Sequence, residues 1–420
     1  MKKEVVIIAG ICYPISSASG SIALKCADYI HDVCNIRLIS LQEGNNVANG
    51  MSYRNVSIHT LTQWRLRLAQ LSEKGIINSS KLKSRFFKCA NYILRIIGRI
   101  QSMLFTVDNC WWYKKKAYKQ LEKLNKEQKI DIILSISAPI ESHYAAKKFK
   151  ERHPEVRWVT YWTDLFAAKI NRRNIFINLD KMKKMEFDIL KSSDYILATE
   201  EVFEIFNERA NNYVANKISA IPYIFKQEVL NRDNYVPITN DEPIRCVYMG
   251  SFYRDIRNPE FMLKFFTALE KPYILDLYTT GNCADIVHKY ATKSNGRITE
   301  HGLVSAEQLD DIMSKAHILI NIENAVPTCI PSKLFELMSY RKPIINFKHK
   351  NQNYDVLHDY PCTLNIIIGD DIESTINSFN RYFEEAQSFN QVSSQYILNH
   401  YNNHMESHVI NIFRNIIYNL

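Results

Sequence analysis

The stretch IPSKLFELMSYRKPII, residues 330–345, predicts a turn, a short helix and a strand in direct succession. Its Pro-Ser pair at 331–332 is typical of a helix start, and the apolar run that follows carries a single acid, Glu336. A Lys-Pro pair then leads into PIINF (343–347), an apolar run of strand length. A helix that returns directly to an apolar strand is typical of a parallel sheet covered by helices.

The same alternation of short apolar runs and amphipathic helical patterns continues along the chain. Runs that are apolar on both faces suit parallel strands with helices on either side, which places the protein in the α/β class. We expect strands at 4–10, 36–40, 131–137, 156–162 and 194–200, and then at 244–250, 273–279, 318–323 and 343–347.

A polar segment with two prolines, residues 226–243, separates two such series of strands. A chain of 420 residues is also longer than one hydrophobic core usually serves. We therefore expect two doubly wound, Rossmann-like domains, at 1–225 and 244–395, facing each other across a cleft. The final residues, 396–420, are expected to form a helix that packs back toward the N-terminal domain. Ligands of such sheets bind at the carboxyl ends of the strands.

Several common motifs are missing from the sequence. It contains no G-x-G, no GK[ST], no D-x-D, no G-x-S-x-G and no H-E-x-x-H, so the usual dinucleotide, ATPase, hydrolase and zinc-protease motifs are absent. Its nine cysteines form no C-x-x-C pair, which fits scattered thiols in a reducing cytosol. We expect neither a bound metal nor a cofactor.

Positive charge is concentrated between residues 81 and 120, which contain ten Lys or Arg and one acid, Asp108. Phe, Trp and Tyr are interspersed, so this segment predicts contact with an anionic membrane surface. Arg95 and Arg99 interrupt its most apolar run, which therefore is not expected to span a bilayer. Two alternatives are a solvated amphipathic helix and a nucleic-acid surface, but no nucleic-acid motif accompanies it. We expect a cytoplasmic protein peripheral at the inner face of the cell membrane.

Together these features resemble the GT-B glycosyltransferases, specifically the large retaining class called family 4. The opening stretch is similar to the donor-binding segment of that family, in which Glu336 would bind the nucleotide ribose. Four further segments resemble the family in the right order, and they lie at 131–150, 157–167, 247–266 and 301–322. The resemblance covers most of the chain from 131 to 347.

The resemblance implies a nucleotide-sugar site in the C-terminal domain. Gly250 would end the first strand of that domain, and Arg254 or Arg257 would then reach the donor phosphates. Ser332 and Lys333 would present a helix N-terminus and a positive charge to the diphosphate. Each of these basic residues has the alternative of being an exposed side chain without a function.

Two residues of the N-terminal domain are candidates for catalysis. His143 follows a strand and titrates near neutrality, so it is a candidate for acceptor binding or proton transfer, with a structural histidine as the alternative. Asp164, in YWTDLF, is the candidate for holding or deprotonating an acceptor hydroxyl, with a turn or helix cap as the alternative.

The implied function is metal-independent transfer of a hexose from a nucleotide-sugar to a glycan in bacterial cell-surface polysaccharide synthesis, such as capsule or O-antigen, with a lipid-linked acceptor and retention of configuration. One position departs from the family. Its pattern of Glu, seven residues and Glu has Thr328 in place of the first Glu. A non-catalytic donor-binding or scaffold protein and a nucleotide-sugar epimerase are therefore the alternatives.

Overall fold

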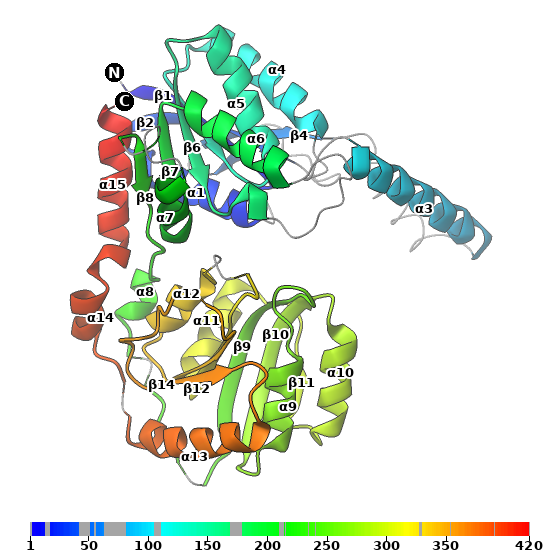
Figure 1. Cartoon of the computed structure of the whole chain (residues 1–420), viewed down its shortest axis with the longest axis vertical. Helices are drawn as coiled ribbons and strands as arrows, with labels where there is room; N and C mark the ends of the chain where they lie inside the picture. Colours follow the sequence, from blue (N-terminus) through cyan, green and yellow to red (C-terminus); the bar gives the residue numbers. More distant parts are fainter. Residues whose placement is uncertain are drawn as a thin grey trace. The chain divides into compact units, whose positions relative to one another are not determined.

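The computed structural model describes residues 2–12, 17–41, 51–53, 56–62, 81–104, 111–168, 179–209, 214, 216–233, 235–239, 241–326, 330–352, 354–389 and 391–419. The chain divides into two compact units (Figure 1). Unit 1 comprises Met1–Ile221 together with Ile410–Leu420, and unit 2 comprises Pro222–Val409. The final residues of the sequence therefore belong to the first unit.

Unit 1 is built on an eight-stranded sheet in the order β3-β4-β2-β1-β5-β6-β7-β8. All neighbouring strands are parallel except β3, which is antiparallel to β4 at the edge. The strands are β1 (Lys3–Ala9), β2 (Cys34–Leu41), β3 (Met51–Tyr53), β4 (Val56–Leu61), β5 (Ile132–Ile136), β6 (Arg157–Trp162), β7 (Tyr195–Ala198) and β8 (Ile218–Ala220). Successive residues of β1 from Val5 to Ala9 are completely buried, because helices cover both faces of the sheet.

Unit 1 contains seven α-helices in the described residues and one 3-10 turn. They are α1 (Ala18–Ile30), α3 (Lys81–Leu104), α4 (Trp111–Glu127), α5 (Glu141–Arg152), α6 (Leu179–Ser192), α7 (Glu200–Arg209), the 3-10 turn η1 (Phe166–Ala168) and the end of α15 (Glu406–Asn419). Helices α4, α5 and α6 bury their apolar sides with Val6 and Ile8 in one core. On α15, the Arg414 guanidinium donates to both carboxylate oxygens of Asp32 at 2.9 Å, which ties this helix to the segment after α1.

Unit 2 is built on a six-stranded parallel sheet in the order β11-β10-β9-β12-β13-β14. The strands are β9 (Ile244–Phe252), β10 (Tyr273–Gly281), β11 (Ile298–Glu300), β12 (Ile318–Ile322), β13 (Ile344–Lys348) and β14 (Thr363–Ile367). Strands β9 and β12 lie side by side at its centre although α9, β10, α10, β11 and α11 separate them in the sequence.

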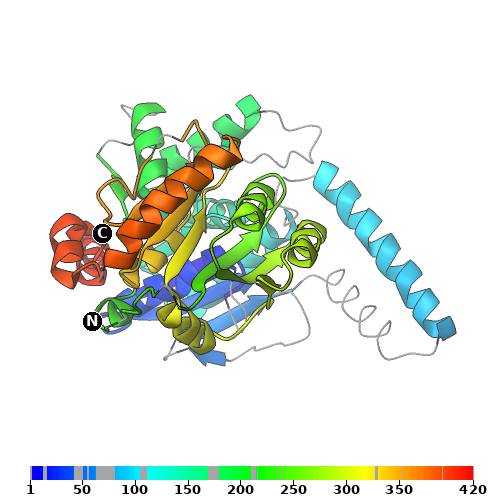
Figure 2. The ribbon, with the colours of Figure 1, turned by 90° about the horizontal axis from the view of Figure 1, so that it is seen from below.

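Two sets of helices cover the faces of the second sheet. They are α8 (Gln227–Leu230), α9 (Glu260–Ala268), α10 (Ala284–Lys293), α11 (Ala306–Lys315), α12 (Lys333–Ser339), α13 (Ile372–Ser388), α14 (Ser394–His400) and the 3-10 turn η2 (Asn402–His404). Helices α9, α10 and α13 share one core, and α13 is the orange helix in Figure 2. Helices α8, α11, α12 and α14 share the other core. Ser305 caps α11 through a reciprocal capping box with Gln308.

The structure confirms the predicted α/β class, with parallel strands in every expected run. It adds a short helix, α8, within the segment predicted to be a linker, and it divides residues 396–420 between α14, η2 and α15. Within the residues that the structure describes, no helix is both long and apolar enough to cross a membrane.

Gly281, at the end of β10, provides a test of this packing. Its φ is +120°, and a Cβ there would lie 1.9 Å from the Phe252 carbonyl oxygen at the end of β9. We expect Gly281→Ala to lower the free energy of unfolding by at least about 3 kcal/mol. The alanine would have to adopt a strained φ, and the backbone at Phe252 would have to move away from the added Cβ. Gly302→Ala is the matched control, since its φ is +72° but no atom lies within 4 Å of the added carbon.

The control should cost only about 1 to 2 kcal/mol. Urea denaturation of both variants measures the difference. Equal losses would show that the two strand ends do not approach each other so closely.

Candidate functional site

The candidate site of unit 2 lies where β9 and β12 end. Since these parallel strands are neighbours, the segments that follow them emerge at the same edge of the sheet. After β9 the chain makes a tight turn in which the Arg257 N–H donates to the Tyr253 carbonyl at 2.7 Å. After β12 it continues into Asn324, and α12 follows further along. The predicted phosphate loop and the predicted ribose helix therefore share one edge.

Arg257 is the central side chain of this edge. Its Nη2 donates to the Asn324 Oδ1 at 2.7 Å, which joins the two loops. A Cβ added to Gly250 would lie 3.4 Å from the Arg257 Nη1 and 3.0 Å from the Tyr248 hydroxyl. The guanidinium thus lies against β9 at a position where a larger residue would displace it. Its Nε is buried without a hydrogen-bond partner among the described residues.

Lys333, the first residue of α12, lies near two further cations and one carboxylate. Lys226 forms an ion pair with Glu336, which lies in the first turn of this helix. Burial lowers the pKa of Lys333; the Glu336 carboxylate opposes this effect, while Arg257 and Lys226 add to it. Lys333 therefore lies within electrostatic reach of Arg257, Lys226 and Glu336. We call these four residues the basic cluster.

Lys226 was not predicted from the sequence, where it is one lysine in a polar linker. Its position depends on the backbone, because the Lys226 N–H donates to the Ser339 hydroxyl at the end of α12 at 2.8 Å. Short helix α8, which follows directly, packs against α12 as well. No pattern in the sequence indicates this contact.

Ser332 and Arg254 are both exposed in unit 2. Ser332 is exposed at the N-cap position of α12, but its side chain makes no capping hydrogen bond. Arg254 is exposed and forms an ion pair with Asp285 on α10, which holds the pKa of that carboxyl below its ordinary value. Arg257, not Arg254, is thus part of the basic cluster. Thr328 lies outside the described residues.

A buried acid and a row of asparagines lie beside the cluster. Asn321, Asn346 and Asn365 occupy facing positions on β12, β13 and β14. Asn346 accepts from the Asn321 Nδ2 at 2.7 Å, and its own Nδ2 donates to the Glu323 Oε1 at 2.8 Å and to the Asn365 Oδ1 at 2.9 Å. The other Glu323 oxygen is buried without a partner in the described chain. Burial raises the pKa of Glu323 to about 7.

In unit 1, His143 is completely buried on α5. Its Nδ1 is 2.8 Å from the Ser135 hydroxyl, which also accepts from the Trp158 Nε1 at 2.8 Å. The imidazole packs against the Trp162 ring with centroids 4.5 Å apart. Burial lowers its pKa to about 3, so the ring is neutral at physiological pH. His143 therefore contacts the ends of both β5 and β6, through Ser135 and Trp162. It has no exposed atom that could contact an acceptor.

Asp164 is exposed directly after β6, at the carboxyl edge of the sheet. Its Oδ2 accepts from the Thr163 hydroxyl at 3.3 Å, and Thr163 in turn bonds to Ser137, which follows β5. The carboxylate is therefore held at a sheet edge and remains open to solvent. This is the geometry that a group contacting an acceptor hydroxyl requires.

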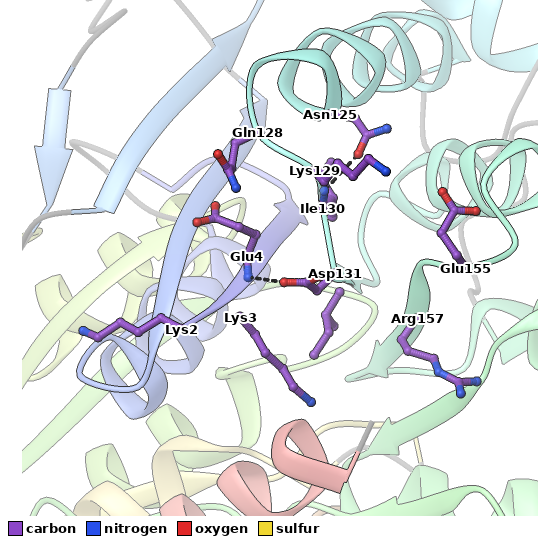
Figure 3. A pocket seen from close by; sticks show the side chains of 11 residues that line it. Lys2, Lys3, Glu4, Asn125, Gln128, Lys129, Ile130, Asp131, Glu155 and Arg157 are labelled. Atoms are coloured by element: carbon purple, nitrogen blue, oxygen red, sulfur yellow. Dashed lines mark hydrogen bonds between the residues drawn. The ribbon is translucent and has the colours of Figure 1, made fainter.

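A cavity of about 480 Å³ lies at the other edge of the first sheet, around the amino ends of β1, β5 and β6 (Figure 3). Charged side chains of both signs line it, among them Lys2, Glu4, Asp131 and Arg157. The Glu4 N–H donates to the Asp131 carboxylate at 2.8 Å across it. Because ligands of parallel sheets bind at the carboxyl ends, we do not assign the predicted chemistry to this cavity.

The described residues contain no group of three His, Cys, Asp or Glu side chains that could hold a metal ion. Chemically, the basic cluster suits a different ligand. Guanidinium and ammonium groups bind the oxygens of a diphosphate, and a carboxylate accepts hydrogen bonds from a pair of hydroxyls.

Glu323 predicts a pH dependence of stability. The unfolded chain ionises this acid near pH 4.5, whereas the folded protein retains the proton until about pH 7. Between these values the folded state binds more protons, so the stability falls as the pH rises. Relative to Glu323→Gln, wild type should lose roughly 2 to 3 kcal/mol between about pH 5 and about pH 8.

Urea denaturation at both pH values measures this loss, with the exposed Glu300→Gln as the control. A parallel response of wild type and Glu323→Gln would contradict the burial of a protonated acid.

Several solved structures resemble this chain over its whole length. No protein-family model and no curated protein matches the sequence. Sucrose-phosphate synthase from Thermosynechococcus elongatus matches with a TM-score of 0.66 at 12% identity, covering 100% of both chains. The lipopolysaccharide outer core galactosyltransferase WaaB matches with 0.60 at 14%, covering 99% of both chains. HepE from Anabaena, in complex with UDP and glucose, matches with 0.64 at 9%, covering 100% of both. These likenesses confirm the predicted GT-B fold.

Proposed function

We propose that the protein is a glycosyltransferase that moves a hexose from a nucleotide-sugar donor to a hydroxyl of a glycan. The observation that carries this proposal is the basic cluster, in which Lys333 lies within electrostatic reach of Arg257, Lys226 and the Glu336 carboxylate at the carboxyl edge of the second sheet. An excess of positive charge beside one carboxylate matches a nucleoside diphosphate, whose ribose supplies two hydroxyls and whose phosphates supply negative charge.

Each residue of the cluster has a separate role in this proposal. Glu336 accepts hydrogen bonds from the ribose hydroxyls, and Lys226 moves from the carboxylate to a phosphate when the donor binds. Arg257 and Lys333 stabilise the charge that develops on the leaving diphosphate as the bond between sugar and phosphate breaks. These cations perform the task that a divalent metal has in other transferases, so we propose metal-independent transfer. Gly250 and Ser332 border the same ligand.

On unit 1 we propose Asp164 as the residue that holds the acceptor hydroxyl and receives its proton. The new bond joins the anomeric carbon to that hydroxyl oxygen, and the diphosphate departs with the electron pair of the old bond. His143, being buried and neutral, is proposed as a positioning residue that keeps the end of β5 beside β6 through Ser135. Retention of configuration follows only from the resemblance to family 4.

The acceptor is proposed to be a lipid-linked glycan of a cell-surface polysaccharide, used at the cytoplasmic face of the cell membrane. The support is the basic and aromatic composition of residues 81–120. WaaB, described as a lipopolysaccharide galactosyltransferase, has the same fold. HepE was solved with UDP and glucose, so uridine nucleotides are the first donors to test.

Glu336→Ala tests the ribose assignment. We expect UDP, GDP, CMP or dTDP to raise the melting temperature of wild type, with or without EDTA. Loss of charged hydrogen bonds to the ribose should weaken that nucleotide about 10-fold to 100-fold in the variant. Unchanged affinity in a folded Glu336→Ala protein would refute the role of this carboxylate.

Two arginines offer a matched pair for the phosphate assignment. Arg257→Gln should weaken diphosphate binding about ten-fold or more, because it removes a charged partner from the basic cluster. Arg254→Gln loses the same charge from the same loop, but its side chain is paired with Asp285. It should change the affinity less than three-fold unless Arg254 releases Asp285 when the donor binds. A larger effect at Arg254 than at Arg257 would reverse the assignment.

Asp164→Asn tests transfer itself. With membrane extract as the source of acceptor, wild type should release nucleoside diphosphate only when the extract is present. The variant should lose at least about a hundred-fold in rate because it cannot take the proton, while donor binding stays unchanged. Turnover without acceptor would favour the epimerase, and donor binding without turnover would favour the scaffold.

A further inference from the structure

Helix α3 carries an exposed apolar stripe. Phe86, Ile93, Ile96 and Ile100 are 71%, 51%, 37% and 50% exposed, and Cys89 between them is exposed too. Five of the twelve large apolar side chains exposed in the described part of the chain lie on this helix, the fifth being Tyr92. Burying this surface against a partner would be favourable, so the stripe marks an interaction surface.

The spacing of the stripe keeps it on one side of the helix. Its residues follow one another at steps of three and four, which aligns Phe86, Cys89, Ile93, Ile96 and Ile100 along α3. Another side is covered by protein, because Leu94 is buried and its neighbours Ala90 and Ile97 are half-buried. The stripe is therefore a second apolar side of α3, more exposed than the first.

The charge of α3 identifies the partner. Its sequence contains six Lys or Arg and no acid, and Arg85 and Lys88 are exposed beside the stripe. A second copy of α3 would bring like charges together with no carboxylate to pair them. A bilayer with anionic headgroups instead supplies negative charge for the basic residues and an acyl boundary for the stripe.

We propose that α3 docks the protein on an anionic lipid bilayer, lying in the plane of the headgroups with the stripe inserted toward the acyl chains. Its 24 residues make a helix roughly 36 Å long. Tyr92, with an apolar ring and a polar hydroxyl, belongs at the same depth. The inference goes beyond the proposed transferase, because this docking requires neither donor nor acceptor.

Flotation of the full-length protein with vesicles tests the proposal. We expect binding to vesicles of phosphatidylcholine with phosphatidylglycerol, and little binding to phosphatidylcholine alone. Ile93→Ser with Ile96→Ser should reduce partitioning at least about ten-fold by removing inserted side chains. Arg85→Gln with Lys88→Gln should reduce it about 30-fold, roughly five-fold for each lost charge.

Two controls match these variants. Leu303→Ser removes an apolar side chain of unit 2 that is 81% exposed, and Lys126→Gln removes an exposed charge from α4. Both should float like wild type. All substitutions are at exposed positions, so unchanged melting temperatures will show that the variants fold.

Four results of the flotation and binding experiments would overturn the proposal. In the first the protein does not float with vesicles, and in the second the α3 variants float as well as wild type. In the third it binds both kinds of vesicle equally, and in the fourth it binds RNA but not vesicles. A dimer in light scattering that Ile93→Ser disrupts would assign the stripe to a second copy instead. Loss of donor binding with flotation intact would leave this inference standing while removing the proposed function.

Discussion

The parallel pairing of β9 with β12 is the constraint on which the site of unit 2 depends. It brings the loop after β9 next to Asn324, although three helices and two strands lie between them in the sequence. The bond from Arg257 to Asn324 then fixes the guanidinium at that edge, and Gly250 provides the space for it. Without this pairing, Arg257 would be an ordinary surface arginine and α12 would carry an isolated Glu336.

Much of the fold is predictable because the central strands are apolar on both faces. Strands β3, β4, β8, β11 and β14 were not predicted, since they are short or carry polar residues at the sheet edges and flanks. In the site, Glu336, Lys333 and Arg257 were predicted and come together. Lys226 was not, because its approach depends on a tertiary backbone bond to Ser339. The burial of His143 depends on packing against Trp162 and likewise leaves no sequence signal.

Positive charge exceeds negative charge at the candidate site of unit 2. The basic cluster contains three cations and one carboxylate, Glu336, while burial keeps the nearby Glu323 protonated to near neutral pH. An acid held neutral contributes no charge to oppose the cations, so the edge stays positive. The asparagine row stabilises this arrangement, because the buried Asn321 and Asn346 amides hydrogen-bond to each other and Asn346 also donates to Asn365. Positive potential at a rigid edge is the property that an anionic ligand requires.

Helix α15 has a consequence for how the protein is made. Its first residues belong to unit 2 and its last residues belong to unit 1. Within unit 1, the Lys3 ammonium of β1 donates to the carbonyls of Ile417 and Tyr418. Those residues are synthesised after the whole of unit 2. The amino-terminal half therefore emerges from the ribosome lacking one of its helices, and it stays incomplete until translation has passed through the other half. The order of synthesis and the order of completion are thus reversed for the two units.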